Sequence, residues 1–73
     1  MTRTEALTLT GQALYGERWQ TALAADLGTS DRTVRRWVAG QTAIPSGVMS
    51  DLRALLIARA VEIASALDKI ESA

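Results

Sequence analysis

The chain has 73 residues, a formal net charge of zero, and neither cysteine nor histidine. A chain this short forms one domain and buries only about 60% of its unfolded surface, so we expect marginal stability unless a second subunit contributes. The missing residue types exclude disulfides, zinc fingers, thiol nucleophiles and the commonest general base. We therefore expect residues 1–73 to form a single domain that is not an enzyme and needs no cofactor and no metal.

Three of the eight basic residues form a cluster in the chain. Seven of the eight are arginines, and three of these, Arg32, Arg35 and Arg36, fall within five positions. One surface can therefore be positive on a chain that has no net charge. The N-terminal MTRTEALTLT lacks a long apolar run, and the apolar C-terminal part is interrupted by charged residues. The sequence predicts a cytoplasmic protein with no membrane partner and no evident small-molecule ligand.

The first predicted helix extends from about Arg3 to Tyr15. Thr2 and Glu5 have the spacing of a capping box, in which each side chain binds the other residue's backbone amide. Gly16 is expected to end this helix, while Gly11 weakens it by about 1 kcal/mol relative to alanine. Its expected inner face consists of Ala6, Leu7, Thr10, Ala13 and Leu14.

Two short helices joined by a tight turn are predicted next, over residues 20–40. The first extends from about Glu17 to Leu27 and ends at Gly28, which suits a left-handed cap. Its apolar stripe consists of Trp19, Leu23, Ala24 and Leu27. The second begins with Ser30 as a side-chain cap and extends to Ala39, before Gly40. Two helices joined by about three residues around a glycine form the helix-turn-helix pattern.

The stretch QTALAADLGTSDRTVRRWVAG resembles the small helix-turn-helix repressors of the Cro and phage-repressor type. SDRTVRRW is also similar to the corresponding stretch of anti-CRISPR-associated repressors, and LYGERW and AGQTAIP look like segments of small bacterial or prophage regulators. The resemblance implies double-stranded DNA as the partner. It rests on Gln20 at the helix start, Leu23 and Ala24, the turn glycine Gly28, and the apolar Val34 and Trp37 of the recognition helix. The base-reading positions that it implies are Ser30, Asp31, Arg32, Arg35 and Arg36.

The geometry of an α-helix predicts the same outer face for the recognition helix, independently of the resemblance to these repressors. On a wheel of about 100° per residue, Arg32 and Arg36 lie almost opposite Val34, and Arg35 and Thr33 flank them. Arginine suits the major groove because its planar group can donate two hydrogen bonds to one guanine. Such a strip can also be an ordinary solvated face, and capping is the favoured role for Asp31. Further phosphate contacts are predicted for Gln20, Thr33, Gln41 and Thr42.

The last predicted helix follows Pro45 and spans residues 46–71, with Gly47 to about Glu71 free of breakers. Ile44 is expected to fill the core before it. The helix has more apolar positions than so small a body can cover, so we expect it to pair with a second copy. The alternative is that it only completes the core and frays, and the pattern does not distinguish parallel from antiparallel pairing. The predicted dimerisation residues are Leu56, Ala60, Ile63, Leu67 and Ile70.

Together these features predict an all-α fold of about four helices, including a helix-turn-helix and a long C-terminal helix. The expected function is sequence-specific binding of a homodimer to an inverted repeat, with two recognition helices about 34 Å apart in successive major grooves. Without an effector domain, we expect a transcriptional repressor, with regulation of its own gene and an origin in a phage or mobile element as further expectations. The alternative is an antitoxin-like or adaptor protein whose C-terminal helix binds another protein.

Overall fold

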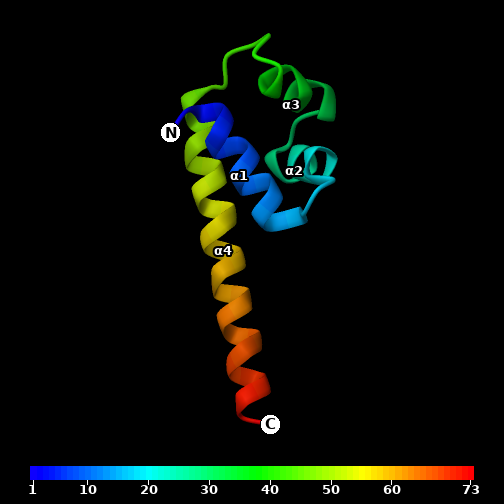
Figure 1. The fold of residues 1–73 in the computed structure, drawn as a ribbon. Coiled ribbons are helices and arrows are strands. Elements are labelled where there is room, and N and C mark those ends of the chain that lie inside the picture. Colours follow the sequence, from blue (N-terminus) through cyan, green and yellow to red (C-terminus); the bar gives the residue numbers. More distant parts are fainter.

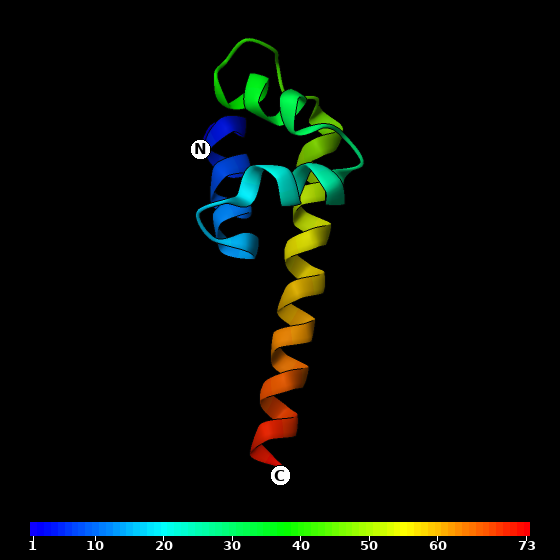
Figure 2. The same ribbon diagram turned by 90° about the vertical axis from the view of Figure 1, so that its right-hand side faces the viewer.

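The computed structural model describes residues 1–73 and contains four α-helices and no strand (Figure 1), which confirms the predicted all-α fold. The helices span Arg3–Tyr15 (α1), Trp19–Leu27 (α2), Asp31–Val38 (α3) and Ser46–Glu71 (α4). Helices α1, α2 and α3 form a body beside the N-terminal half of α4, and the C-terminal half of α4 extends beyond this body (Figures 1 and 2). The molecule therefore measures 49 × 21 × 21 Å. None of its helices combines the length and the apolar character needed to cross a membrane.

Local capping signals set the helix ends. The predicted capping box of α1 is confirmed, since Glu5 N donates to Thr2 Oγ1 at 3.0 Å and Thr2 N donates to Glu5 Oε1 at 3.3 Å. The predicted start of α2 at Glu17 was wrong, because residues 17–18 form a turn and α2 begins at Trp19. α3 ends at Val38, one residue before the predicted Ala39, while the bounds of α1, the end of α2 and the predicted span of α4 over residues 46–71 are confirmed.

The core draws on all four helices and on the loop before α4. Ile44 is only 5% exposed, which confirms that it fills the core. The expected burial of Ala13 was wrong, because α1 buries the face around Leu14, and Ala13 lies about 100° from that residue on the helix. The buried apolar cluster consists of Leu7, Trp19, Leu23, Ala24, Val34, Trp37, Ile44 and Leu52.

Gly11 lets the indole of Trp19 pack directly against the backbone of α1. A Cβ atom built at Gly11 would lie 2.1 Å from Trp19 Cε3 and 2.4 Å from Cδ2. Trp19 is only 5% exposed, so its ring cannot move aside into solvent. The helix-weakening glycine is therefore a packing requirement at the crossing of α1 and α2.

Substitution Gly11→Ala is expected to destabilise the protein by about 1–3 kcal/mol, despite the better helix propensity of alanine, because it overpacks the core. Gly47→Ala is the matched control, since it lies inside α4 and, apart from its chain neighbours and the nearby backbone of the helix, nothing lies within 4 Å of its Cβ position. That control should be neutral or stabilise by about 0.4–1 kcal/mol. Urea unfolding of the two variants measures the difference. Equal or greater stability of Gly11→Ala would show that Trp19 has room to move.

Hydrogen bonds from two arginine side chains connect the ends of α1 to distant parts of the chain. Arg3 Nη1 donates to the carbonyl oxygen of Ile44 at 2.7 Å, and Arg59 Nη1 donates to that of Leu14 at 3.2 Å. Arg59 also approaches Glu62 at 3.4 Å within α4. These contacts hold the start of α1 against the loop before α4 and the end of α1 against α4 itself, at the point where α4 leaves the body.

A tyrosine–carboxylate contact links the end of α1 to α2. Tyr15 Oη donates to Asp26 Oδ2. Burial, followed by the hydrogen bond to Asp26 and its negative charge, raises the pKa of Tyr15 to about 12, and the positive charge of Arg59 opposes this shift. Each of the first three causes favours the neutral phenol, so the folded state holds its proton more tightly than the unfolded chain does.

The pKa of Tyr15 makes stability fall at high pH. Its contribution is fully present below pH 10.0, the ordinary value, and is lost as the pH rises towards about 12. Tyr15 is the only tyrosine of the chain, so a tyrosinate absorbance titration reports it alone. Asp26→Asn should lower this pKa towards 10.0, whereas Asp68→Asn, at the far end of α4, should not. An unchanged titration in Asp26→Asn would contradict the contact.

Candidate nucleic-acid interface

The turn between α2 and α3 fixes the angle between the two helices. Gly28 adopts the left-handed conformation at φ 71° and ψ 29°, as predicted, and Thr29 N donates to the carbonyl oxygen of Ala24 at 2.9 Å. Ala24 is 2% exposed, and its small side chain allows close approach. On the other side of the turn, Val34 and Trp37 are buried. One side of α3 is thus held in the core, and the opposite side faces outwards.

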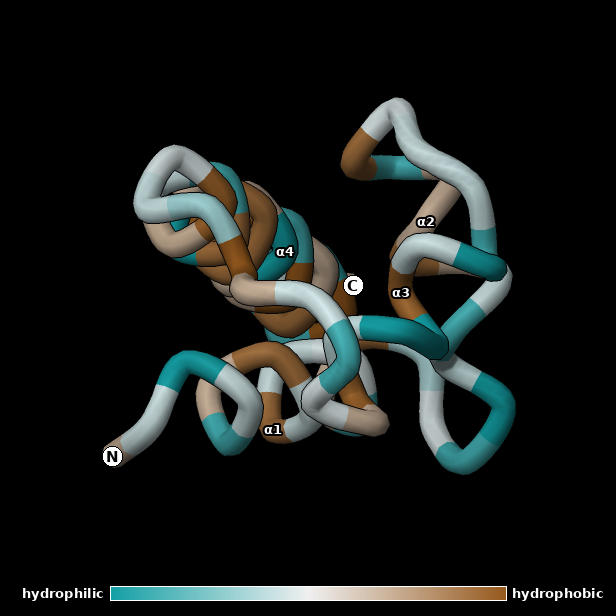
Figure 3. Tube along the Cα trace, turned by 90° about the horizontal axis from the view of Figure 1, so that it is seen from above, coloured by the Kyte–Doolittle hydropathy of each residue, from teal (hydrophilic) through white to brown (hydrophobic).

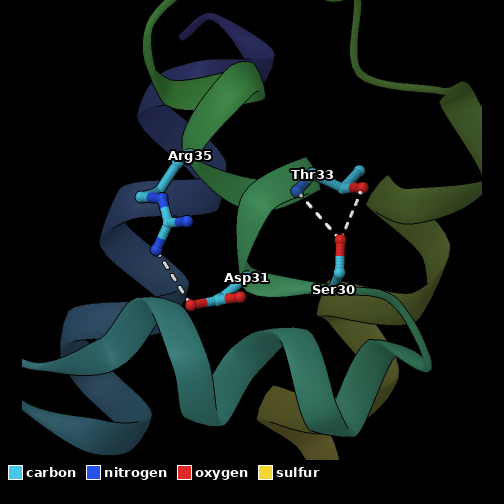
Figure 4. Close-up of polar contacts among 4 residues, drawn as sticks. All are labelled: Ser30, Asp31, Thr33 and Arg35. Atoms are coloured by element: carbon cyan, nitrogen blue, oxygen red, sulfur yellow. Dashed lines mark hydrogen bonds and ion pairs between the residues drawn. The ribbon is translucent and has the colours of Figure 1, made fainter.

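Side-chain hydroxyls occupy the N-terminus of α3 (Figure 4). Ser30 Oγ accepts from Thr33 N at 3.2 Å and lies 3.0 Å from Thr33 Oγ1. The predicted cap is confirmed. Since both hydroxyls already bind each other, any DNA contact by Ser30 or Thr33 has to form in addition to this cap or at its expense.

An ion pair within α3 separates the three clustered arginines into two kinds. Arg35 Nη1 lies 2.9 Å from Asp31 Oδ2, one turn earlier, and this pair is on the opposite side of the helix start from the hydroxyl cap (Figure 4). Both side chains are exposed, so the pair contributes at most about 1 kcal/mol to stability. Arg32 and Arg36 are exposed and form no ion pair or hydrogen bond through their side chains. These two guanidinium groups are therefore free to bind a partner.

The three arginines meet the following loop in one shallow hollow of about 380 Å³. Gln41 N donates to the carbonyl oxygen of Arg36 at 3.0 Å, which holds the loop against the end of α3. Of the predicted phosphate-binding residues, only Gln41 lines the hollow; Thr42 is exposed nearby in the loop, while Thr33 and Gln20 are partly buried on α3 and α2. The residues that line the hollow are Arg32, Arg35, Arg36, Ala39 and Gln41.

The chemistry of this surface is that of a binding site for anions. Its charged side chains are guanidinium groups, whose paired N–H donors suit phosphate oxygens and the edge of guanine. The nearest carboxylate, that of Asp31, is already paired with Arg35. No group of three or more histidine, cysteine or carboxylate side chains is placed to hold a metal ion anywhere in the chain.

Comparisons of the chain with protein-family models, curated proteins and solved structures found no match. The function of this surface is therefore argued from its geometry and chemistry.

Proposed function

We propose that the chain binds double-stranded DNA as a homodimer and represses transcription, with α3 in the major groove. The observation that carries this proposal is the pair of unpaired, exposed guanidinium groups of Arg32 and Arg36 on the outer side of a helix whose inner side is buried. The major groove, about 12 Å wide, admits an α-helix, and arginine pairs with the O6 and N7 atoms of guanine. The resemblance to Cro-type repressors points the same way.

The predicted contact residues take different roles in this complex. Arg32 and Arg36 read bases, while Arg35, held by Asp31, lies at the edge of the strip and contacts phosphate or a flanking base. Gln41 is placed beside them to donate to a phosphate. Ser30 and Asp31 act first as the cap and the ion-pair partner at the helix start. Contacts with flanking phosphates are assigned to Gln20, Thr33 and Thr42.

The exposed apolar stripe of α4 supports the homodimer in this proposal. Beyond the body, α4 exposes large apolar side chains, including Ile63 at 61%, Leu67 at 54% and Ile70 at 73%. An uncovered apolar stripe of this kind marks an interaction surface. A two-fold dimer doubles the arginine strips of a chain without net charge and makes an inverted repeat the matching operator.

The same exposed stripe favours a second candidate function, in which α4 binds a different protein, as in an antitoxin or adaptor. The two functions differ in the state of the isolated chain. Sedimentation of the purified protein should show a dimer for the repressor and a monomer for the adaptor.

Footprinting on the DNA upstream of the protein's own gene, over a series of salt concentrations, tests DNA binding. We expect a protected inverted repeat and an affinity that falls with salt, with a log–log slope of about 0.9 per phosphate contact. Protection that is absent, or independent of salt, would contradict operator binding.

Breaking the Asp31–Arg35 ion pair is expected to strengthen DNA binding. Asp31→Asn removes a carboxylate near the phosphates and releases the guanidinium group of Arg35, 2.9 Å away, for one additional contact. The affinity should rise several-fold, and the salt dependence should steepen by about 0.9 for that contact. Asp68→Asn makes the same change in net charge far from α3 and should have little effect. Weaker binding by Asp31→Asn would show that Asp31 itself helps to position α3.

A further inference from the structure

The face of α4 that packs against the body is also the face that stays exposed beyond it. Leu52 is 3% exposed, and Leu56, Ile63 and Ile70 lie within about 40° of it on the helix while becoming 37%, 61% and 73% exposed. Arg59 lies in the same row, where it donates to Leu14 at the end of α1. A single apolar row thus begins in the core and ends in solvent.

The position of the body restricts how a second α4 can cover this row. Viewed along α4, helices α1 to α3 lie to one side of it (Figure 3), and the buried Leu52 shows that this is the side of the apolar row. A parallel partner on this face would extend into the space that α1 occupies. An antiparallel partner would instead extend away from the body, past the C-terminus of α4, and leave α1 undisturbed.

We propose that a second copy of the chain covers this row in antiparallel orientation, with the two-fold axis between Ala64 and Ser65. This arrangement rests on the proposed homodimer and specifies its geometry. It places Glu62 opposite Lys69 of the partner subunit, and symmetry makes this ion pair twice. It also places large side chains against small ones, with Ala60 facing Leu67 of the partner subunit and Ile63 facing Ala66 of the partner subunit.

Other registers are less favourable in charge. Moving the antiparallel helices by one heptad places Glu62 opposite Glu62 of the partner subunit in one direction, and Lys69 opposite Lys69 of the partner subunit in the other. A parallel pair would bring Arg59 against Arg59 of the partner subunit and would give Glu62 no basic partner on the other subunit, in addition to Arg59 of its own chain. Charge and size complementarity therefore select the same antiparallel register.

Cysteine cross-linking tests the orientation cleanly because the chain has no cysteine of its own. Variants Ala60→Cys and Leu67→Cys, one of them carrying a tag, are mixed and oxidised. In the antiparallel pair the two sites face each other, so the mixture should give a tagged–untagged disulfide. In a parallel pair they are offset by about 10 Å along the helix, beyond the roughly 7 Å limit between Cα atoms in a disulfide.

Ile70→Cys provides the opposite control. Two copies of this residue would face each other in a parallel pair, but would be about 16 Å apart along the axis of the antiparallel one. Cross-linking of Ala60→Cys with Leu67→Cys, and none within Ile70→Cys, supports the proposal. Cross-linking within Ile70→Cys alone would overturn it, as would a dimer in which neither combination cross-links.

Exchanging the charges of Glu62 and Lys69 tests the register of the dimer independently of cross-linking. Glu62→Lys should raise the dimer dissociation constant roughly tenfold, since it replaces two attractions between the subunits by two repulsions and also removes the Arg59–Glu62 pair within each chain. Adding Lys69→Glu should restore dimerisation, because the antiparallel pairs then reform with reversed sign. Failure of the double variant to recover would count against this register.

Sedimentation and DNA binding of the unmodified chain separate failure of the arrangement from failure of the proposed function. A dimer that binds DNA but cross-links in the parallel pattern overturns only the antiparallel arrangement. A chain that stays monomeric overturns the arrangement and the homodimer together. A cross-linked antiparallel dimer that binds no DNA would support the antiparallel arrangement and contradict the proposed repressor function.

Discussion

The double substitution Arg32→Ala/Arg36→Ala is expected to abolish recognition of the operator while leaving the fold intact. Each good arginine–guanine pair contributes about 1–3 kcal/mol of discrimination, so losing both should weaken specific binding roughly 30-fold or more per half-site. The fold should stay intact because both side chains are exposed and form no hydrogen bond or ion pair, and because alanine is a better helix former than arginine. Electrophoretic mobility shifts with operator and with unrelated DNA measure the loss.

Arg53→Ala is the matched control, because it removes an exposed arginine that forms no hydrogen bond or ion pair, on α4 instead of α3. It should change specific binding little. The single variants Arg32→Ala and Arg36→Ala should each relax discrimination at a different base pair of the half-site. Normal operator binding by the double variant, with an unchanged circular dichroism spectrum, would refute the proposed recognition surface.

Replacing side chains of the apolar row on α4 should lower operator affinity by a similar factor. Ile63→Gln/Leu67→Gln removes two side chains that are 61% and 54% exposed in the single chain and that a partner would cover. Covering each contributes up to about 1.5–3 kcal/mol, and a symmetric dimer loses four of them. We expect a monomer in sedimentation and a fall in operator affinity of at least tenfold, because the two half-sites are no longer bound together.

The other side of α4 supplies the control. Ile57 and Val61 are comparably exposed, at 51% and 64%, but lie away from the row that continues from Leu52. Ile57→Gln/Val61→Gln should therefore leave the dimer intact. If this control dissociates the dimer and the first variant does not, the interface lies on the opposite face of the helix.

Local signals in the sequence predict most of the fold. The bounds of α1 follow from the Thr2–Glu5 capping box and Gly16, and the turn before α3 follows from Gly28 and Ser30. These signals are readable in the sequence because each residue acts on the backbone of residues close to it in the chain. The start of α2 lacks such a signal, since Arg18 forms no side-chain cap and the turn after Gly16 is not marked by its own residues.

Contacts between distant residues could not be predicted in the same way. The packing of Trp19 on Gly11 and the bonds of Arg3 and Arg59 to carbonyl oxygens 41 and 45 residues away depend on how the helices cross. In the candidate site, the wheel places Arg32 and Arg36 outwards, and both are exposed. The Asp31–Arg35 ion pair has a local signal in the sequence, which is the i,i+4 spacing of opposite charges. The helical wheel does not reveal it, because a wheel shows only the face on which each residue lies.

In the proposed antiparallel dimer, the length of α4 beyond the body would set the spacing between the two DNA half-sites. In the antiparallel pair, the first turns of the two α4 helices are about 55 Å apart at 1.5 Å per residue, and α3 lies near that end of α4 (Figures 1 and 2). This separation exceeds the one-turn spacing of about 34 Å expected from the sequence and is closer to two turns, about 68 Å, so we expect half-sites centred two helical turns apart. The operator would then carry a spacer of unread base pairs whose length is set by a protein helix that never touches the DNA.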